Sequence, residues 1–138
     1  MRTAALICFA VVGCGGYVPP DRETQALTAA VLGCWDLTTI NFRSPYLPAP
    51  TRVRLDSMPS YADAMYYELQ RLTPPPPDIP QERNYWYISK GNRHVMMKLG
   101  DGGKGIWLDV IPEADGNRMY GRADAGATVR ATRISCTS

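Results

Sequence analysis

Residues 95–110, VMMKLGDGGKGIWLDV, decide the fold class of this 138-residue chain. Apolar side chains recur at every second position on both sides of a glycine-rich turn: Val95, Met97 and Leu99 before it, and Ile106, Leu108 and Val110 after it. Successive side chains of a β-strand point to opposite faces of the sheet, whereas a helix repeats about every 3.6 residues. The period of two therefore predicts two antiparallel strands that share one apolar face.

The same pattern continues on both sides of this pair. Short stretches of β-forming residues bounded by Gly, Pro, Asn and Asp are predicted as strands, and there are eight in all: 34–41, 51–56, 64–72, 84–89, 93–99, 105–111, 117–124 and 128–136. The composition of 64–72 also suits a helix, although Tyr66 and Tyr67 favour β-structure. In YWYI (85–88), Trp86 and Ile88 are expected on one face and the two tyrosines on the other, either as core and surface or as a ligand platform.

The connections between these strands predict the architecture. SKGN at 89–92 and EADGN at 113–117 are typical of tight hairpin turns. The strands are spaced too closely for crossover helices, so neighbours are expected to pair antiparallel. An all-β chain with eight strands in simple order closes most readily into an up-and-down barrel, because closure removes exposed sheet edges. TPPPPDIP at 73–80 is expected to be an extended loop.

The N-terminus predicts export. Met1-Arg2 is a short positive start, and a mostly apolar run at 4–12 leads into Val11-Val12-Gly13-Cys14. This order is typical of a secretory signal peptide, and a bilayer span needs about 20 apolar residues. The tetrad resembles the lipobox of bacterial lipoproteins, which implies that Cys14 is lipidated and becomes the new N-terminus. Plain secretion and an unprocessed anchor are the alternatives.

These assignments divide the chain into three parts. Residues 1–13 are expected to be a lipoprotein signal peptide, 14–32 a lipidated tether, and 33–138 the barrel domain. Within the tether, 21–32 suits either a short helix, with Asp21 as N-cap and Gly33 just past its end, or an ordered linker.

The positions of the four cysteines then predict a role for each. Cys8 lies in the removed segment and Cys14 carries lipid, which leaves Cys34 and Cys136. Two cysteines in an oxidising compartment predict one disulfide. Its loop of about 100 residues corresponds to roughly 4–5 kcal/mol of loop-closure entropy.

A closed barrel brings these two cysteines together, because the first strand then pairs antiparallel with the last. If Cys34 faces Cys136, Leu37 faces Arg133, and Trp35 lies diagonal to Arg133 on the side of the sheet opposite the sulfurs. This parity predicts an inward Trp35 with the Arg133 guanidinium beside its ring, a cation–π contact of about 0.5–2 kcal/mol. Arg130 is expected to face the other way.

Gly33-Cys34-Trp35 matches the G-x-W that begins the first strand of lipocalins and related calycin barrels, which also place an arginine of the last strand against this tryptophan. Over residues 33–136 the chain therefore resembles a small bacterial lipoprotein with a lipocalin-like β-barrel. The resemblance implies a barrel signature of Gly33, Trp35 and Arg133. It also implies that the tether leaves from the closed end and that the mouth, facing away from the membrane, is lined by the loops 42–50, 73–83, 100–104 and 125–127.

Charge and residue types disfavour several function classes. The formal net charge is +2 and there is no basic stripe, which argues against a nucleic-acid partner. The single histidine, His94, is expected in solvent. One histidine supplies too few ligands for a zinc site, and a base exposed to solvent lacks the orienting partner of a catalytic triad. GDGGKG at 100–105 lacks the spacing of a phosphate-binding loop and leads into a strand. We therefore expect no enzymatic activity, no metal and no cofactor.

Two main hypotheses for function remain. The first is a non-enzymatic lipoprotein, anchored in the cell envelope at the outer membrane and facing the periplasm, that binds a small apolar or amphipathic ligand. Its candidate lumen residues are Trp35, Leu37, Val53, Leu55, Trp86, Ile88, Val95, Met97, Leu99, Ile106, Leu108 and Val110. The second is a protein-binding module of the protease- or lysozyme-inhibitor type with a filled lumen, acting through the loops 42–50 and 73–83 or through Tyr17. A structural envelope lipoprotein is a third possibility.

Overall fold

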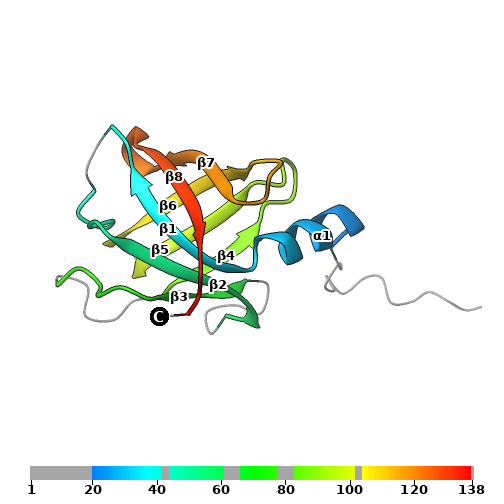
Figure 1. The fold of residues 1–138 in the computed structure, drawn as a ribbon, viewed down its shortest axis with the longest axis horizontal. Helices are drawn as coiled ribbons and strands as arrows, with labels where there is room; N and C mark the ends of the chain where they lie inside the picture. Colours follow the sequence, from blue (N-terminus) through cyan, green and yellow to red (C-terminus); the bar gives the residue numbers. More distant parts are fainter. Residues whose placement is uncertain (1–19, 42–43, 61–65, 78–82, 102–103, 138) are drawn as a thin grey trace, which may run out of the picture.

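Every predicted strand is present in a computed structural model of the chain, which describes residues 20–41, 44–60, 66–77, 83–101 and 104–137. Each strand pairs antiparallel with its sequence neighbour, and β8 returns to β1, so the sheet closes into the expected up-and-down barrel (Figure 1). The strands are β1 Gly33–Thr39, β2 Thr51–Pro59, β3 Tyr67–Arg71, β4 Tyr85–Ile88, β5 Val95–Asp101, β6 Lys104–Pro112, β7 Arg118–Ala123 and β8 Thr128–Ile134. Helix α1, Arg22–Val31, precedes β1, and a short 3-10 turn, η2, Asp124–Gly126, joins β7 to β8.

The segment before the barrel is a helix and not a linker. The Asp21 side chain accepts a hydrogen bond from the Thr24 backbone N–H at 2.7 Å, which makes Asp21 the N-cap. This hydrogen bond is the main reason why the pKa of the Asp21 carboxyl is lowered. Val31 is buried, and Leu27 packs on the core, so α1 covers one end of the barrel (Figure 1).

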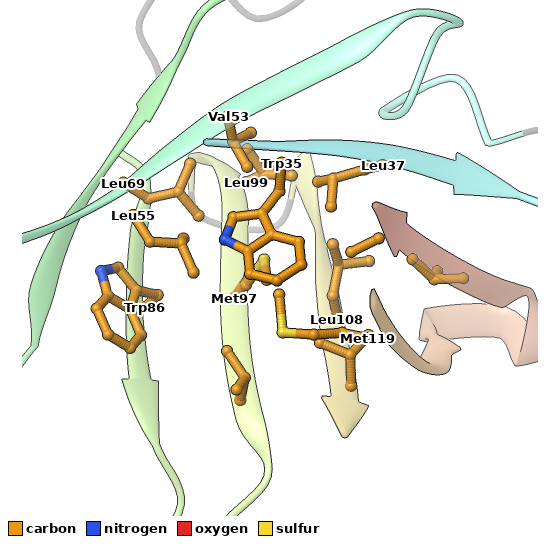
Figure 2. Close-up of a cluster of buried hydrophobic side chains, with 14 of the residues drawn as sticks. Trp35, Leu37, Val53, Leu55, Leu69, Trp86, Met97, Leu99, Leu108 and Met119 are labelled. Atoms are coloured by element: carbon orange, nitrogen blue, oxygen red, sulfur yellow. The ribbon is translucent and has the colours of Figure 1, made fainter. Parts of the chain in front are cut away.

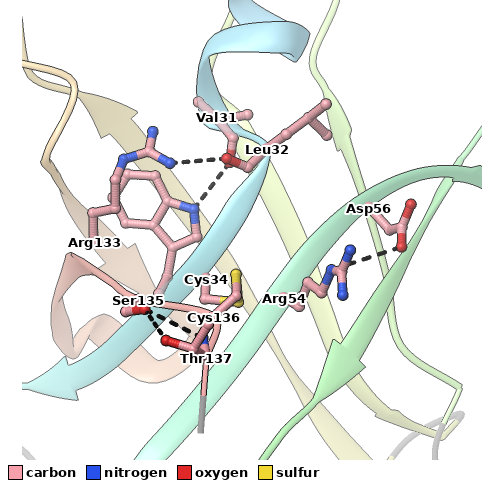
Figure 3. The surroundings of a disulfide bond; sticks show 10 residues. Val31, Leu32, Cys34, Arg54, Asp56, Arg133, Ser135, Cys136 and Thr137 are labelled. Atoms are coloured by element: carbon pink, nitrogen blue, oxygen red, sulfur yellow. Dashed lines mark hydrogen bonds and ion pairs between the residues drawn. A yellow bond between two sulfur atoms is a disulfide. The ribbon is translucent and has the colours of Figure 1, made fainter.

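The barrel seam has a different register from the one predicted. Cys34 lies opposite Ile134, and Trp35 lies directly opposite Arg133. The predicted strand register, with Cys34 opposite Cys136, was therefore wrong by two residues. Strand β8 ends at Ile134, and Cys136 reaches back diagonally to form the predicted disulfide, with a Cα–Cα distance of 5.3 Å (Figure 3). Because the shift is even, the predicted faces of both strands are correct.

The hairpins follow the sequence signals with one difference. At 113–117 the N–H of Glu113 bonds the carbonyl of Arg118 at 2.8 Å, and Gly116 has a φ of +74°, as expected of a tight turn. The connection at 89–94 is longer than the tight turn predicted for SKGN. There the N–H of Ser89 bonds the carbonyl of His94 at 2.9 Å.

Candidate functional site

The lumen is lined by the side chains that the alternation predicted. All of the candidate lumen residues are buried and belong to one apolar cluster (Figure 2). The cluster also contains eight side chains that the prediction missed: Val31, Leu47, Leu69, Ala123, Ala127, Met119, Val129 and Ala131. The last three alternate with exposed residues along β7 and β8, so the same period of two was available to find them.

These side chains fill the lumen. Trp35 is 1% exposed, and Met97, Leu108 and Met119 are each 0% exposed. A side chain without exposed area has no space beside it for a water-sized molecule, whether outside the protein or in an internal void. Figure 2 shows the Trp35 ring in the middle of the cluster, with Met97 and Met119 close to it. Beside these four side chains there is therefore no preformed space for a ligand.

The end of the barrel that the lipocalin resemblance assigns to a mouth is covered. Leu47 is 6% exposed and belongs to the core cluster, and Tyr46 packs against that cluster. The loop is held by bonds from Arg71 Nη2 to the Tyr46 carbonyl, at 3.4 Å, and from Thr51 Oγ1 to the Pro48 carbonyl, at 2.5 Å. Residues 44–50 thus form a plug over this end; residues 42–43 of the predicted loop lie outside the described residues.

The proline-rich loop is attached next to this plug. Two hydrogen bonds attach the start of this loop to β2. The Leu72 N–H donates to the Arg52 carbonyl at 2.8 Å, and the Arg52 N–H donates to the Thr73 hydroxyl at 3.1 Å. Pro76 is buried, whereas Pro74, Pro75 and Pro77 are exposed. Residues 78–82 of the predicted loop lie outside the described residues.

The opposite end is closed by the predicted signature residues. The Arg133 guanidinium lies 4.3 Å from the centroid of the Trp35 ring. It also donates to the carbonyls of Leu32 at 2.8 Å, Ala30 at 2.6 Å and Gly116 at 2.9 Å. The Trp35 indole N–H donates to the Val31 carbonyl at 2.9 Å (Figure 3). Arg133 therefore caps the C-terminus of α1 while it covers the tryptophan.

The arrangement explains why a glycine occupies position 33. Its φ is +124°, and a Cβ atom there would lie 3.0 Å from Arg133 Nη1. Glycine allows both the backbone conformation and the close approach of the guanidinium. The Gly33–Trp35–Arg133 signature is thus a latch that joins helix, first strand and last strand.

His94 has a partner that the sequence did not reveal. It was expected in solvent on the outer face, but it is half-buried, with Nδ1 2.7 Å from Asp109 Oδ1 on the neighbouring strand β6. Within the described part of the chain, no group of three or more His, Cys, Asp or Glu side chains is placed to hold a metal ion.

Aromatic side chains cluster on the outer surface of the barrel. Tyr66 stacks on Tyr85 and Tyr87, with ring centroids 4.6 and 4.8 Å apart. Trp107 meets the same two tyrosines edge to face, at 5.7 and 6.4 Å. Burial by these neighbours raises the pKa of the Tyr85 and Tyr87 phenols. The outward direction of the two tyrosines was predicted, but their contacts with Tyr66 and Trp107 were not.

Comparisons with known proteins name no family. No protein-family model matches the chain, and no curated protein sequence matches it. None of the described helices combines the length and the apolar character needed to cross a membrane. Cys14 and Tyr17 lie outside the described residues, so lipidation and the N-terminal arm stay predictions.

Proposed function

We propose that this chain is an exported, lipid-anchored and non-enzymatic protein of the bacterial cell envelope that binds a protein partner through the plugged end of its barrel. The single observation that carries the proposal is the filled lumen, in which Met97, Leu108 and Met119 have no exposed area. Small-molecule sites are concave and usually preformed. A barrel whose side chains occupy its interior has its loops and outer surface available for recognition.

The plugged end suits protein recognition. The exposed residues Pro74, Pro75 and Pro77 follow directly after a backbone held to β2, and the plug presents the exposed Pro48 beside the half-buried Tyr46. Prolines have little conformational entropy to lose on binding, and pre-organised loops favour affinity for the same reason. Tyrosine is enriched among the residues that dominate interface energies. These features support a protein partner at residues 44–50 and 72–77.

The anchor is supported by sequence and by chain direction. The predicted lipid on Cys14 precedes α1, and α1 covers the end of the barrel opposite the plug (Figure 1). A tether from that end leaves the plugged end free. Incorporation of labelled palmitate, abolished in Cys14→Ser, is the expected result; an unlabelled mature protein would contradict the anchor.

Native mass spectrometry tests the filled lumen. The mature chain from residue 14, incubated with an envelope lipid extract, is expected to remain without adduct. The barrel fold is compatible with ligand binding, but a ligand would have to displace Leu47 at the plug and side chains such as Met97 inside. A stoichiometric lipid adduct that disappears in Met97→Trp would therefore favour the small-ligand hypothesis over the protein-binding one.

Site-specific crosslinking tests the partner. A photoreactive residue at Pro75 is expected to give one discrete crosslinked protein in intact cells. The matched control is Arg130, an exposed residue on the outer side of β8, where the same residue is expected to give none. Equal crosslinking at both positions, or none at either, would count against the plugged end as the binding surface.

A further inference from the structure

The outer surface of the barrel carries a second apolar layer that the filled core does not use. We define the aromatic wall as the outward-facing side chains that run from the start of β3 to β7: Tyr66, Tyr85, Tyr87, Met96, Trp107, Ile111 and Tyr120. Ile111 and Tyr120 are cross-strand partners that are 49% and 48% exposed. The wall follows five neighbouring strands around the curved sheet of the barrel. It has two apolar parts, the half-buried rings around Trp107 and the exposed pair of Ile111 and Tyr120, because the outward side chains of Asp109 and Arg122 lie between them. Apolar side chains gathered on the outside of a small barrel are candidates for an interaction site.

The rings of the wall are held in place. Tyr66 stacks on both tyrosines of β4, and Trp107 leans across β5 to meet them edge to face. The Lys98 ammonium lies 5.6 Å from the Trp107 ring centroid. Phenols and indoles with an apolar body and a polar tip are the side chains that favour the interface between bilayer and water.

The charges beside the wall are compatible with a headgroup layer. Asp109 is paired with His94 at 2.7 Å and lies opposite Arg122 on β7. The turn at 89–94 adds the exposed side chains of Lys90 and Arg93 at one edge of the wall. Asp109 therefore lies between a histidine and an arginine, and the exposed Lys90 ammonium is a charge that anionic lipid attracts.

The chain exit places the wall close to the anchor. Arg93, in the turn between β4 and β5, holds the start of α1 through contacts with Asp21 at 3.7 Å and Glu23 at 2.5 Å. The next residue, His94, lies at the edge of the wall. Five residues lie between Cys14 and Pro20, which limits the reach of the tether to roughly 20 Å. A lipid on Cys14 would therefore hold the start of α1, and with it the turn at 89–94, within about this distance of the bilayer.

We propose that the aromatic wall is a membrane-contact surface, so that the anchored barrel lies on its side against the lipid headgroups, with Trp107 and the tyrosines in the interface. This inference rests on the proposed lipid anchor. It deepens the proposed function because it orients the barrel: the plugged end then projects along the membrane surface and stays accessible to a partner. Both attachments would act together, because stable membrane anchoring combines more than one signal.

The test uses the tryptophans as depth reporters. Trp35 and Trp86 are sealed in the core at 1% and 0% exposure, so acyl-chain quenching from outside reports Trp107. The lipidated protein is reconstituted into phosphatidylethanolamine–phosphatidylglycerol vesicles with brominated acyl chains, and the mature Cys14→Ser chain is added to the same vesicles. Quenching is expected in both proteins and is lost in Trp107→Phe.

Variants of the most exposed wall residues avoid effects on folding. In the Cys14→Ser chain, Ile111→Ser and Tyr120→Ser are each expected to weaken vesicle partitioning about tenfold, because each removes one partly buried apolar contact with the interface. Ile40→Ser is the matched control, as Ile40 is 51% exposed at the end of β1, outside the wall. It is expected to leave partitioning unchanged.

The outcomes separate this proposal from the one on which it depends. Labelling of Cys14 by palmitate without quenching of Trp107 would overturn the wall and leave the anchor. An unlabelled Cys14 with a Trp107-dependent vesicle interaction would overturn the anchor and support the wall. Partitioning that the wall variants do not change, or a stoichiometric protein complex lost in those variants and formed without lipid, would also overturn the membrane proposal.

Discussion

Replacing Arg133 with methionine removes a polar contact that joins the last strand to the C-terminus of α1. The guanidinium donates three hydrogen bonds to backbone carbonyls, those of Leu32, Ala30 and Gly116, and lies 4.3 Å from the Trp35 ring centroid. Methionine keeps an apolar stem of similar length over the ring but donates no hydrogen bond. The substitution therefore isolates the polar part of the latch.

The magnitude follows from these contacts. Hydrogen bonds from charged donors contribute about 1.5–3 kcal/mol each, and the stacked cation adds about 0.5–2 kcal/mol. Arg133 is half-buried, so water recovers part of this when the side chain is absent. We expect Arg133→Met to lower the free energy of unfolding by about 3–4 kcal/mol, which is a large part of the stability of a small domain.

Urea unfolding of the oxidised protein, followed by tryptophan fluorescence, measures this change. The matched control is Arg130→Met on the same strand, which faces outward and is exposed; surface substitutions of this kind usually stay within about 0.5 kcal/mol of wild type. An unchanged m-value in both variants shows that the same two-state transition is compared. A loss below about 1 kcal/mol, or one equal to that of the Arg130 control, would refute the latch.

Three further predictions concern the same end of the molecule. Cys34→Ser or Cys136→Ser is expected to destabilise the barrel by about 2–5 kcal/mol, and peptide mass mapping should show the two cysteines linked; two free thiols in oxidised protein would contradict the seam. Gly33→Ala is expected to cost about 1–3 kcal/mol, because φ is +124° and the new Cβ meets the Arg133 guanidinium, and a wild-type unfolding midpoint would show that this reasoning fails. The folded-state pKa of Asp21 is lowered from 3.8, so its stabilising contribution is present above that value and disappears as the pH falls through the folded pKa. The difference in unfolding free energy between wild type and Asp21→Ala should therefore shrink in acid, and a pH-independent difference would argue against the cap.

The predicted register between β1 and β8 was wrong by two residues, yet the side chains of both strands were assigned to the correct faces of the sheet. The sequence predicted Cys34 opposite Cys136, whereas Cys34 lies opposite Ile134. Side-chain direction repeats every two residues, so a shift of two leaves Trp35 and Arg133 on the same side of the sheet. In the observed register Arg133 also meets the C-terminus of α1, through a contact between residues 103 apart in sequence that no local pattern reveals.

Contacts between distant strands were less accessible to prediction. The outward direction of Tyr85 and Tyr87 follows from alternation alone, but their stacking on Tyr66 depends on the position of that residue directly before β3. His94 and Asp109 meet because the register of β5 and β6 places them diagonally on one face. A sequence pattern assigns each side chain to a face, but it does not assign its neighbours on that face.

The amino-acid sequence by itself determined the eight strands, their up-and-down closure, the disulfide and the inward set around Met97, because alternation and turn residues act over short distances. Only the tertiary structure decided that the lumen is full and that Leu47 covers the predicted mouth. The physical reason is that a cavity is the difference between the volume that the barrel encloses and the volume of its side chains. The enclosed volume depends on strand tilt and stagger and on how distant loops fold over the ends, which no local pattern specifies.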